Sequence, residues 1–316
     1  MNTTLAIIVG QALLMLLLAP LVTGVIKKLK ARLQMRRGAS VGQPFYDLAK
    51  LLRKGMVISA HASWIFRVTP FILFLTTLVV ALLVPTITAN VPLRLVGGVL
   101  AVIYLLALGR FFLALAGLDA GSAFGGMGSS REMTISALAE PAMMLSIFTV
   151  AIVAGSTSLA EMARVAVSQP WRVLNPSQIL ACAAMFIVLL AETGRIPVDN
   201  PATHLELTMI HEAMLLEYSA RHLALLEWAS ALKLFNYSCI GLAVFFPYGI
   251  LGSGADSLAL LGAVPLLIAK LLAGGFVLAL IETLSAKMRI FRAPEFLGTA
   301  FMFAVLAMLV NLLLGA

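Results

Sequence analysis

The 316-residue chain contains little charge. Asp, Glu, Lys and Arg together make up 11% of the residues, whereas 61% are hydrophobic and the mean hydropathy is +1.04. Soluble globular domains contain about 25% charged and about 45–50% apolar residues. A soluble fold of this length could not bury so much apolar surface, which excludes the soluble enzyme classes. Lipid can surround the same surface, so we expect an all-α integral membrane protein.

Cysteine is also scarce, which excludes a disulfide framework and a cysteine-ligated metal cluster. Cys182 and Cys239 lie in separate apolar runs, without the short spacing that zinc or iron–sulfur ligands need. We expect both to be small buried side chains. His204 and His211 superficially resemble metal ligands, but they lack the HExxH order of a helical metal site. We therefore expect no metal and no cofactor in this chain.

The charge that is present is strongly basic, with a net charge of +8. Such basicity is typical of nucleic-acid binding or of contact with anionic membrane lipid. Here the basic residues lie in short segments between apolar runs, which is the pattern of cytoplasmic membrane loops. No soluble domain remains that could bind nucleic acid, so membrane lipid is the expected partner.

Eight segments are apolar for the roughly 20 residues that a spanning helix needs. Together they form a single membrane domain over residues 1–316, and the sequence has no internal repeat of the kind found in many secondary transporters. The first run has no signal-peptide charge pattern or cleavage site, so we expect it to be retained. The expected spans cover approximately residues 4–26, 65–87, 94–117, 134–156, 177–193, 226–250, 257–282 and 296–315.

The distribution of Lys and Arg predicts the orientation. Basic residues gather in the first, third, fifth and seventh loops, whereas the even loops carry only Arg94, Arg164 and Arg172. The positive-inside rule then places the odd loops in the cytoplasm and both termini outside.

Residues 40–54 of the first loop predict a short amphipathic helix at the membrane surface. On a helix, Phe45, Leu48 and Leu51 fall on one face, and Asp47 and Lys50 fall on another. A plain polybasic anchor is the alternative interpretation.

Ionisable residues occur inside the expected spans, where each costs at least about 2.5–3.5 kcal/mol. Glu140 precedes Pro141 in the fourth span, and Lys270 lies near the middle of the seventh. A row of buried acids and bases can pass protons along a hydrated track. It can equally be a set of static ion pairs, and the sequence leaves both open. The other charges of this kind are Arg110, Glu192, Glu227, Lys233 and Glu282.

Two cytoplasmic loops, 118–133 and 193–225, are expected to be functional. The fifth loop begins with prolines that prevent a regular helix, and a short helix is expected after them. Glu206 and Glu217 are eleven residues apart, so on a helix they would share a face about 16 Å apart. A row of carboxylates there fits either a proton entry path or a solvated docking face.

Three stretches of the sequence resemble the membrane subunit that respiratory complex I shares with the group 4 membrane-bound nickel–iron (NiFe) hydrogenases. The first lies in the surface helix, the second in the third loop and fourth span, and the third in the fifth loop. The resemblance extends over nearly the whole chain. The stretches are Arg37–Leu51, with Gln43, Asp47 and Lys50; Gly117–Phe124 and Gly128–Glu132, with Glu140–Pro141; and Ala191–Glu192, Arg195, Pro197, Asp199, Glu206 and Glu217–Ser219.

Some positions depart from the complex I pattern toward the hydrogenases. Ala202 and His204 stand where complex I usually has further acids, and the runs Thr203–Glu212 and Glu282–Arg289 resemble the energy-converting hydrogenase type. The resemblance therefore implies the membrane anchor subunit of a formate hydrogenlyase or energy-converting hydrogenase. A quinone-site subunit of complex I is the alternative, and a stand-alone secondary transporter is the second alternative.

The resemblance implies a non-catalytic subunit of a complex in the prokaryotic inner membrane. The expected partners are homologues of the hydrogenase large and small subunits, an iron–sulfur subunit and antiporter-like membrane subunits. The nickel–iron centre and the iron–sulfur clusters would lie in those partners, and this chain would couple their electron transfer to proton or sodium movement. The implied ion pathway is Glu140, Glu192, Asp199, Glu206, Glu217, Lys233, Lys270 and Glu282, and the residues implied to shape loops or dock partners are Gln43, Asp47, Lys50, Asp119, Arg131 and Arg195.

Overall fold

The computed structural model describes residues 2–59, 62–88, 98–168, 175–199, 209–251, 257–288 and 292–313, and within these ranges it contains helices and no strands. In chain order the helices are α1 (Asn2–Leu33), α2 (Gln43–Arg53), α3 (Trp64–Leu83), α4 (Val99–Asp119), α5 (Ala123–Ala154), α6 (Leu159–Ser168), α7 (Pro176–Glu192), α8 (His211–Leu215), α9 (Ala220–Phe245), α10 (Ser257–Leu284) and α11 (Ala293–Leu313).

Seven of the described helices are long and apolar enough to cross a bilayer: α1, α3, α4, α5, α9, α10 and α11. The segment expected at 177–193 forms α7, whose 17 residues give a length of about 25 Å, the lower limit for a span. Pro176 occupies the first turn of α7, and Gly194, with φ of 58°, follows its end. The prediction of an all-α integral membrane protein is confirmed, with seven candidate spans among the described residues and α7 as a shorter apolar helix where an eighth was expected.

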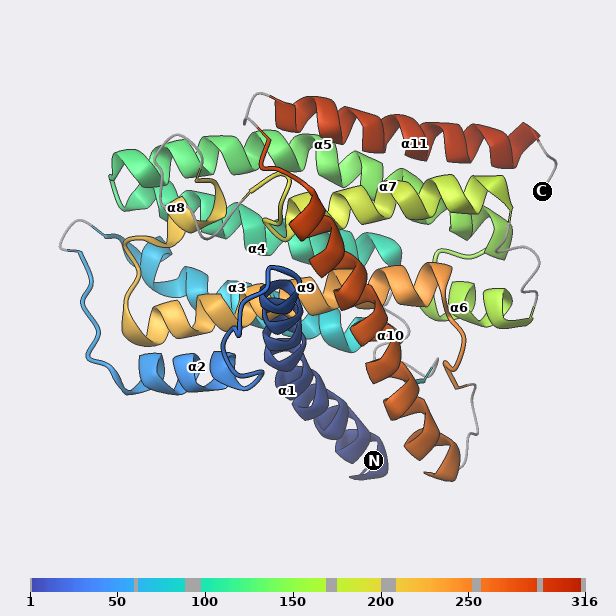
Figure 1. Ribbon diagram of the computed structural model, residues 1–316, viewed down its shortest axis with the longest axis horizontal. Helices are drawn as coiled ribbons and strands as arrows, with labels where there is room; N and C mark the ends of the chain where they lie inside the picture. Colours follow the sequence, from blue (N-terminus) through green and yellow to red (C-terminus); the bar gives the residue numbers. More distant parts are fainter. Residues whose placement is uncertain are drawn as a thin grey trace.

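Most of the long helices lie along the longest axis of the molecule, and two cross them (Figure 1). The helices α3, α4, α5, α7, α9 and α11 follow that axis, whereas α1 and α10 run obliquely and contact each other. At one end of the axis lie α2 and α8, beside the turn from α4 to α5, and α6 lies at the other. We call these the α2 end and the α6 end.

The third loop is much shorter than the predicted 118–133. The helix α4 continues to Asp119 and α5 begins at Ala123. Ser122 caps α5, because its hydroxyl accepts a hydrogen bond of 3.2 Å from the backbone N–H of Gly125. A Cβ on Gly125 would lie 2.2 Å from the carbonyl oxygen of Gly117, so only a glycine allows α4 and α5 to approach so closely here.

The predicted surface helix is present as α2, which lies at the α2 end and packs on α1 and α9 (Figure 1). Leu48 is its buried residue, and Tyr46 and Lys50 on its other faces are exposed. Close contact with α1 is possible because Gly24 has no side chain; a Cβ there would lie 2.0 Å from the carbonyl oxygen of Val41.

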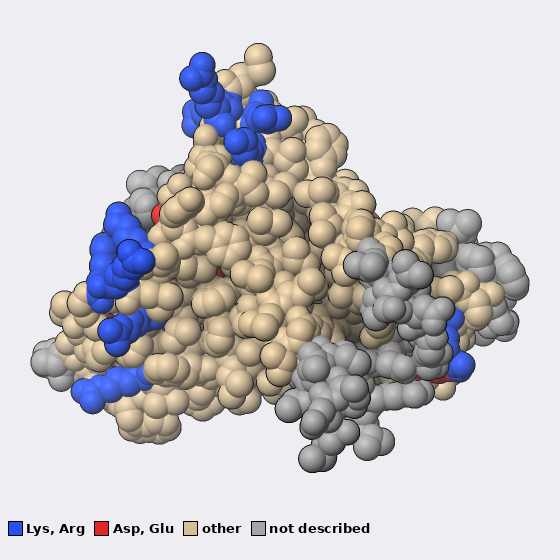
Figure 2. All heavy atoms as spheres, turned by 90° about the horizontal axis from the view of Figure 1, so that it is seen from below, with Lys and Arg blue, Asp and Glu red and all other residues tan. Residues whose placement is uncertain are grey.

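Basic side chains gather at the α2 end and on the adjoining end of α1 (Figure 2). The positive-inside rule assigns a surface of this kind to the cytoplasm, although the orientation stays a prediction. The exposed basic residues of this surface are Arg32, Arg36, Arg37, Lys50, Arg53, Lys54, Arg67 and Arg221.

Polar side chains also join helices inside the bundle. The Asn236 amide of α9 donates to the carbonyl oxygen of Thr77 in α3 at 2.8 Å, and the Trp228 indole donates to that of Leu16 in α1 at 3.1 Å. Such bonds stabilise helix contacts in a membrane by about 0.6 kcal/mol each on average. They hold α9 at the centre of the bundle.

Candidate ion-pathway site

Five charged side chains from four helices meet inside the bundle. Arg110 comes from α4, Glu132 and Glu140 from α5, Glu192 from the last residue of α7, and Lys233 from α9. We call this group the central cluster. It contains three acids and two bases, and its helices are apolar elsewhere, so each charge depends on its partners to offset the cost of leaving water.

Arg110 joins the acids of two other helices. Its guanidinium lies 2.8 Å from Oε1 of Glu140 and forms a second ion pair with Glu192. The Arg110 side chain is only 4% exposed. An arginine has a rigid fork of donors that can serve two carboxylates at once. Arg110 therefore fixes α4, α5 and α7 relative to one another.

Lys233 extends the cluster from Glu192 to a third acid. Its ammonium lies 3.2 Å from Oε2 of Glu192 and 3.9 Å from Oε1 of Glu132. Glu192 thus lies between the two cations, and Lys233 lies between two acids. The result is one continuous series of charged neighbours, with no step longer than 3.9 Å: Glu132, Lys233, Glu192, Arg110 and Glu140.

Glu140 is the member of the central cluster that reaches the outside of the chain. One third of its side-chain surface is exposed, compared with 2% for Glu192. It lies in the middle of α5, directly before Pro141. A carboxylate at this depth that is open to lipid is costly, so this surface suits a neighbouring membrane protein.

A second group of charges joins α1, α10 and the fifth loop, and we call it the junction cluster. Glu282 of α10 lies 2.7 Å from the Lys30 ammonium and 2.8 Å from the Arg195 guanidinium. Asp199 in the same loop lies 3.5 Å from the Lys287 ammonium. These five residues come from three segments that are far apart in the sequence, so the pairs hold the fifth loop against the crossing helices.

A cavity of about 700 Å³ lies between α1, α2, α9 and the fifth loop. This is a typical volume for a ligand pocket. Its walls carry the acids Asp47, Glu212 and Glu227 together with apolar side chains such as Ile26 and Leu48. Glu282 and Asp199 of the junction cluster also line it. The cavity therefore joins a charged mouth at the α2 end to the interior of the bundle.

Two residues separate this cavity from the central cluster. His211 and Ser230 line it, and they also line a smaller cavity of about 20 Å³ whose walls include Glu132 and Lys233. A single layer of side chains thus lies between the large cavity and the buried charges.

Two titratable residues of α8 face this region from outside the spanning helices. Burial, with the nearby Lys233 ammonium, lowers the pKa of His211 to about 4. Burial, with the neighbouring Glu227 carboxylate, raises the pKa of Glu212 to about 7. At neutral pH His211 is uncharged, and Glu212 is divided between its two forms. Of these two residues, Glu212 is therefore the one that gains and loses a proton near neutral pH at the cavity wall.

The structure brings some of the predicted pathway residues together and separates others. Glu140, Glu192 and Lys233 belong to the central cluster, and Asp199 and Glu282 line the large cavity. Lys270 contacts neither cluster; its ammonium donates to the carbonyl oxygens of Phe246 and Tyr248 instead. Glu217 is exposed, and Glu206 lies outside the described residues.

The residues predicted to shape loops make contacts at the α2 end. Asp119 accepts a hydrogen bond of 2.8 Å from the backbone N–H of Ser63 at the start of α3. Arg131 donates to the carbonyl oxygen of Met209 at 2.9 Å, and Arg195 belongs to the junction cluster. Gln43 donates to Asp47 at 2.9 Å within α2, and Lys50 is exposed.

The predicted ion pathway omitted three residues that the structure places at this site. Glu132 was expected in a loop, but it lies in the continuous helix α5. Arg110 was recognised as a charge inside a span, without the partner that explains it. His211 was considered only as a metal ligand; within the described residues no three His, Cys, Asp or Glu side chains gather in a metal-binding arrangement. Helical spacing of Glu132 and Glu140, two turns apart, was the available signal.

Comparison with known proteins gives the family of this chain. A family model described as NADH dehydrogenase matches residues 5–313. The chain is 34% identical over 297 residues to formate hydrogenlyase subunit 4 of Escherichia coli (strain K12), covering 94% of this chain and 95% of that protein. It is 37% identical over 241 residues to hydrogenase-4 component C of the same organism, covering 76% and 75%.

A solved structure has the same fold. A chain of an archaeal respiratory membrane complex, the membrane-bound sulfane sulfur reductase, matches with a TM-score of 0.83 and 22% sequence identity, covering 96% of this chain and 99% of that chain. The family model and the two Escherichia coli relatives agree with the family resemblance of the sequence, and this match shows the fold. The chain belongs to the NADH dehydrogenase family of membrane subunits, that is, the family of complex I subunit 1.

Proposed function

We propose that this chain is the membrane subunit of a multi-subunit hydrogenase-type or related respiratory complex in the prokaryotic plasma membrane. It docks an electron-transfer arm and couples the electron transfer to proton or sodium translocation. The observation that carries this proposal is the continuous series of charged side chains from Glu132 to Glu140, which a single layer of side chains separates from the large cavity.

The coupling begins in the fifth loop. Arg195 of this loop pairs with Glu282 of α10, which also pairs with Lys30 of α1, and Asp199 pairs with Lys287 just after α10, near the basic surface of the α2 end. An arm containing the nickel–iron centre and iron–sulfur clusters, or a related set of cofactors, would bind at that end. A change of charge or position there alters the junction cluster, which lines the same cavity as His211.

From the cavity, the proposed path passes His211 and reaches Lys233 and Glu132. The Lys233 ammonium lies within ion-pair distance of both acids, and its distances to them differ by less than 1 Å. A small shift of the side chain therefore changes which acid it pairs with more closely. Arg110 then links Glu192 to Glu140 electrostatically. An arginine stays protonated, so Arg110 does not carry the proton itself. Instead, when its ion pair with one of the two acids becomes closer, the proton affinity of that acid falls and that of the other acid rises.

Glu140 is the proposed exit toward an antiporter-like membrane partner. Its exposed third supports this assignment, because a membrane neighbour with a polar side chain would cover a carboxylate that lipid cannot solvate. The rival interpretation, a set of static ion pairs, predicts that neutralising Glu140 or Glu192 affects stability alone.

The experiment compares E140Q and E192Q in the intact complex, reconstituted in vesicles, with E161Q as the control. Glu161 pairs with Arg164 on the surface of α6, at the α6 end of the molecule and away from the central cluster. We expect both cluster variants to assemble and transfer electrons but to lose ion translocation, while E161Q keeps both. Full translocation in E140Q and E192Q would leave the static interpretation standing and refute the proposal.

A second candidate function, quinone binding, is favoured by the volume and lining of the large cavity. The side chains of Ile26, Leu48 and Leu51 offer it an apolar wall beside the charged one. Photolabelling with a quinone analogue tests this function. Labelling of α1 or α2 residues that excess quinone prevents would support it, and labelling that excess quinone leaves unchanged would exclude it.

A further inference from the structure

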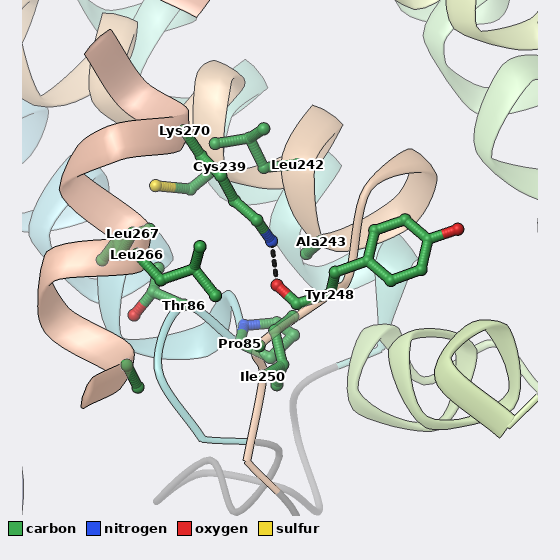
Figure 3. Close-up of a pocket in the computed structure, with 12 residues that line it drawn as sticks. Pro85, Thr86, Cys239, Leu242, Ala243, Tyr248, Ile250, Leu266, Leu267 and Lys270 are labelled. Carbon is green, nitrogen blue, oxygen red and sulfur yellow. Dashed lines mark hydrogen bonds between the residues drawn. The ribbon is translucent and has the colours of Figure 1, made fainter. Parts of the chain in front are cut away.

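Lys270 lies near the middle of α10, yet its partner groups belong to the end of α9. Its ammonium donates to the carbonyl oxygen of Phe246 at 2.7 Å and to that of Tyr248 (Figure 3). Since α9 ends at Phe245, these carbonyls belong to the segment that leaves the helix. Within the described residues no carboxylate pairs with Lys270.

A cation is well placed at this position. The last carbonyls of a helix have no partner within the helix, and the C-terminal end carries a partial negative charge. A lysine from a neighbouring helix satisfies both the hydrogen bonding and the charge. Lys270 therefore acts as a cap on α9 that another helix supplies.

The segment after α9 is shaped to receive Lys270. Gly249 has φ of 82°, and a Cβ there would lie 2.1 Å from Cδ2 of Leu266 in α10. Leu251 then donates its backbone N–H to the carbonyl oxygen of Ile87 at 3.0 Å. The end of α9, the middle of α10 and the segment after α3 thus meet at one place.

A third polar group lines the same place. Thr86 is 7% exposed, and among the described residues its hydroxyl has no hydrogen-bond partner. Thr86 and Lys270 both line a cavity of about 10 Å³, which is about the size of one water-sized sphere (Figure 3). A lysine ammonium has three donors, and two of them serve the carbonyls.

We propose that Lys270 and Thr86 bind one water molecule, and that Lys270 and this water together close the junction between α9, α10 and the segment after α3. The third donor of Lys270 binds the water, and the water satisfies the Thr86 hydroxyl. The site is separate from both charged clusters and does not depend on the proposed ion pathway. Figure 3 shows the side chains that surround it, including Cys239 and Leu267.

Cys239 provides a local probe of this junction. It lines the same cavity and is only 2% exposed, so a thiol reagent reaches it when the junction opens. The measurement is the rate at which N-ethylmaleimide labels Cys239 in the assembled complex, with Cys182→Ser as the background. We expect K270M to raise the rate about tenfold or more, because two hydrogen bonds from a charged group are lost. K270R keeps the cation and its donors and should label slowly.

Slow labelling of K270M, as slow as in the parent, would overturn the capping role. The water is tested separately, in a cryo-electron microscopy map of the parent complex in which ordered water is visible. Density for one water within hydrogen-bond distance of Nζ of Lys270 and Oγ1 of Thr86 would support the site, and its disappearance in T86V would assign it to that hydroxyl. A parent map without this water, or with water unchanged in T86V, would refute the binding site even if K270M fails to assemble.

Discussion

Removing Arg110 should cost stability in a way that depends on pH. The substitution R110M keeps an unbranched apolar side chain but removes the cation that pairs with Glu140 and Glu192. Lys233 then remains as the only base among three acids of the central cluster. Breaking a buried ion pair by removing one partner costs about 3–5 kcal/mol.

The magnitude follows from the proton that the altered cluster must take up. Arg110 carries one positive charge, so uptake of one proton by an acid restores the original net charge. Holding a proton at pH 7 on a carboxylic acid of ordinary pKa, about 4.3, costs about 3.7 kcal/mol. At pH 5.5 the same proton costs about 1.6 kcal/mol. We therefore expect R110M to lose about 3–4 kcal/mol at pH 7 and about 2 kcal/mol less than that at pH 5.5.

The assay is unfolding in mixed detergent micelles with a rising fraction of sodium dodecyl sulfate, at pH 5.5 and at pH 7. The matched control is R164M, in which the lost partner is Glu161 on the surface of α6. Exposed pairs contribute about 0–1 kcal/mol, so the control should lose little at either pH. A loss in R110M that is the same at both pH values, or no larger than in R164M, would refute the reasoning.

Three further predictions concern packing, helix contacts and pH. G125A should destabilise the protein by about 1–3 kcal/mol, because its Cβ would lie 2.2 Å from the Gly117 carbonyl oxygen. The control G126A should not destabilise it, because an added Cβ there would meet no atom within 4 Å. Thermal unfolding of the purified protein measures both. N236A should lose about 0.6–1.7 kcal/mol in the micelle assay with the bond to Thr77, and a neutral result would contradict its role. Glu212 keeps its proton up to about pH 7 in the folded protein, but only up to its ordinary pKa of about 4.5 in the unfolded chain. The stability that this group contributes therefore falls as the pH rises between these two values. E212Q should flatten that part of a plot of melting temperature against pH, and an unchanged plot would contradict the raised pKa.

The spanning helices could be predicted from the sequence, because an apolar segment of the right length must form a helix to satisfy its backbone hydrogen bonds in a bilayer. The surface helix was equally readable, since the apolar face containing Leu48 recurs with helical period. The limits of α5 were not, because its first turns contain Gly125, Gly128 and Ser129, which are typical of loops. Those residues are there because α5 packs closely on α4 and α8, a tertiary requirement that no local pattern expresses.

The candidate site was predicted in part. Glu140, Glu192 and Lys233 were identified because a charge in a span needs an explanation, and each proved to have a partner. The sequence could not predict the pairs that these charges form, because the pairs depend on how each of the four helices is oriented about its own axis. The same uncertainty separates Lys270 from the others: its sequence position is mid-span, but its contacts are with the segment that follows α9, beside which α10 runs obliquely.

The exposed third of Glu140 has a consequence for how the protein is made. A newly inserted copy without neighbours presents part of this acid to hydrocarbon, where a full charge costs about 2.5–3.5 kcal/mol. That cost disappears only when another subunit covers α5. If the proposed membrane partner covers α5, biogenesis of the complex favours early pairing at this surface, and unassembled copies differ from assembled ones in the exposure of this acid.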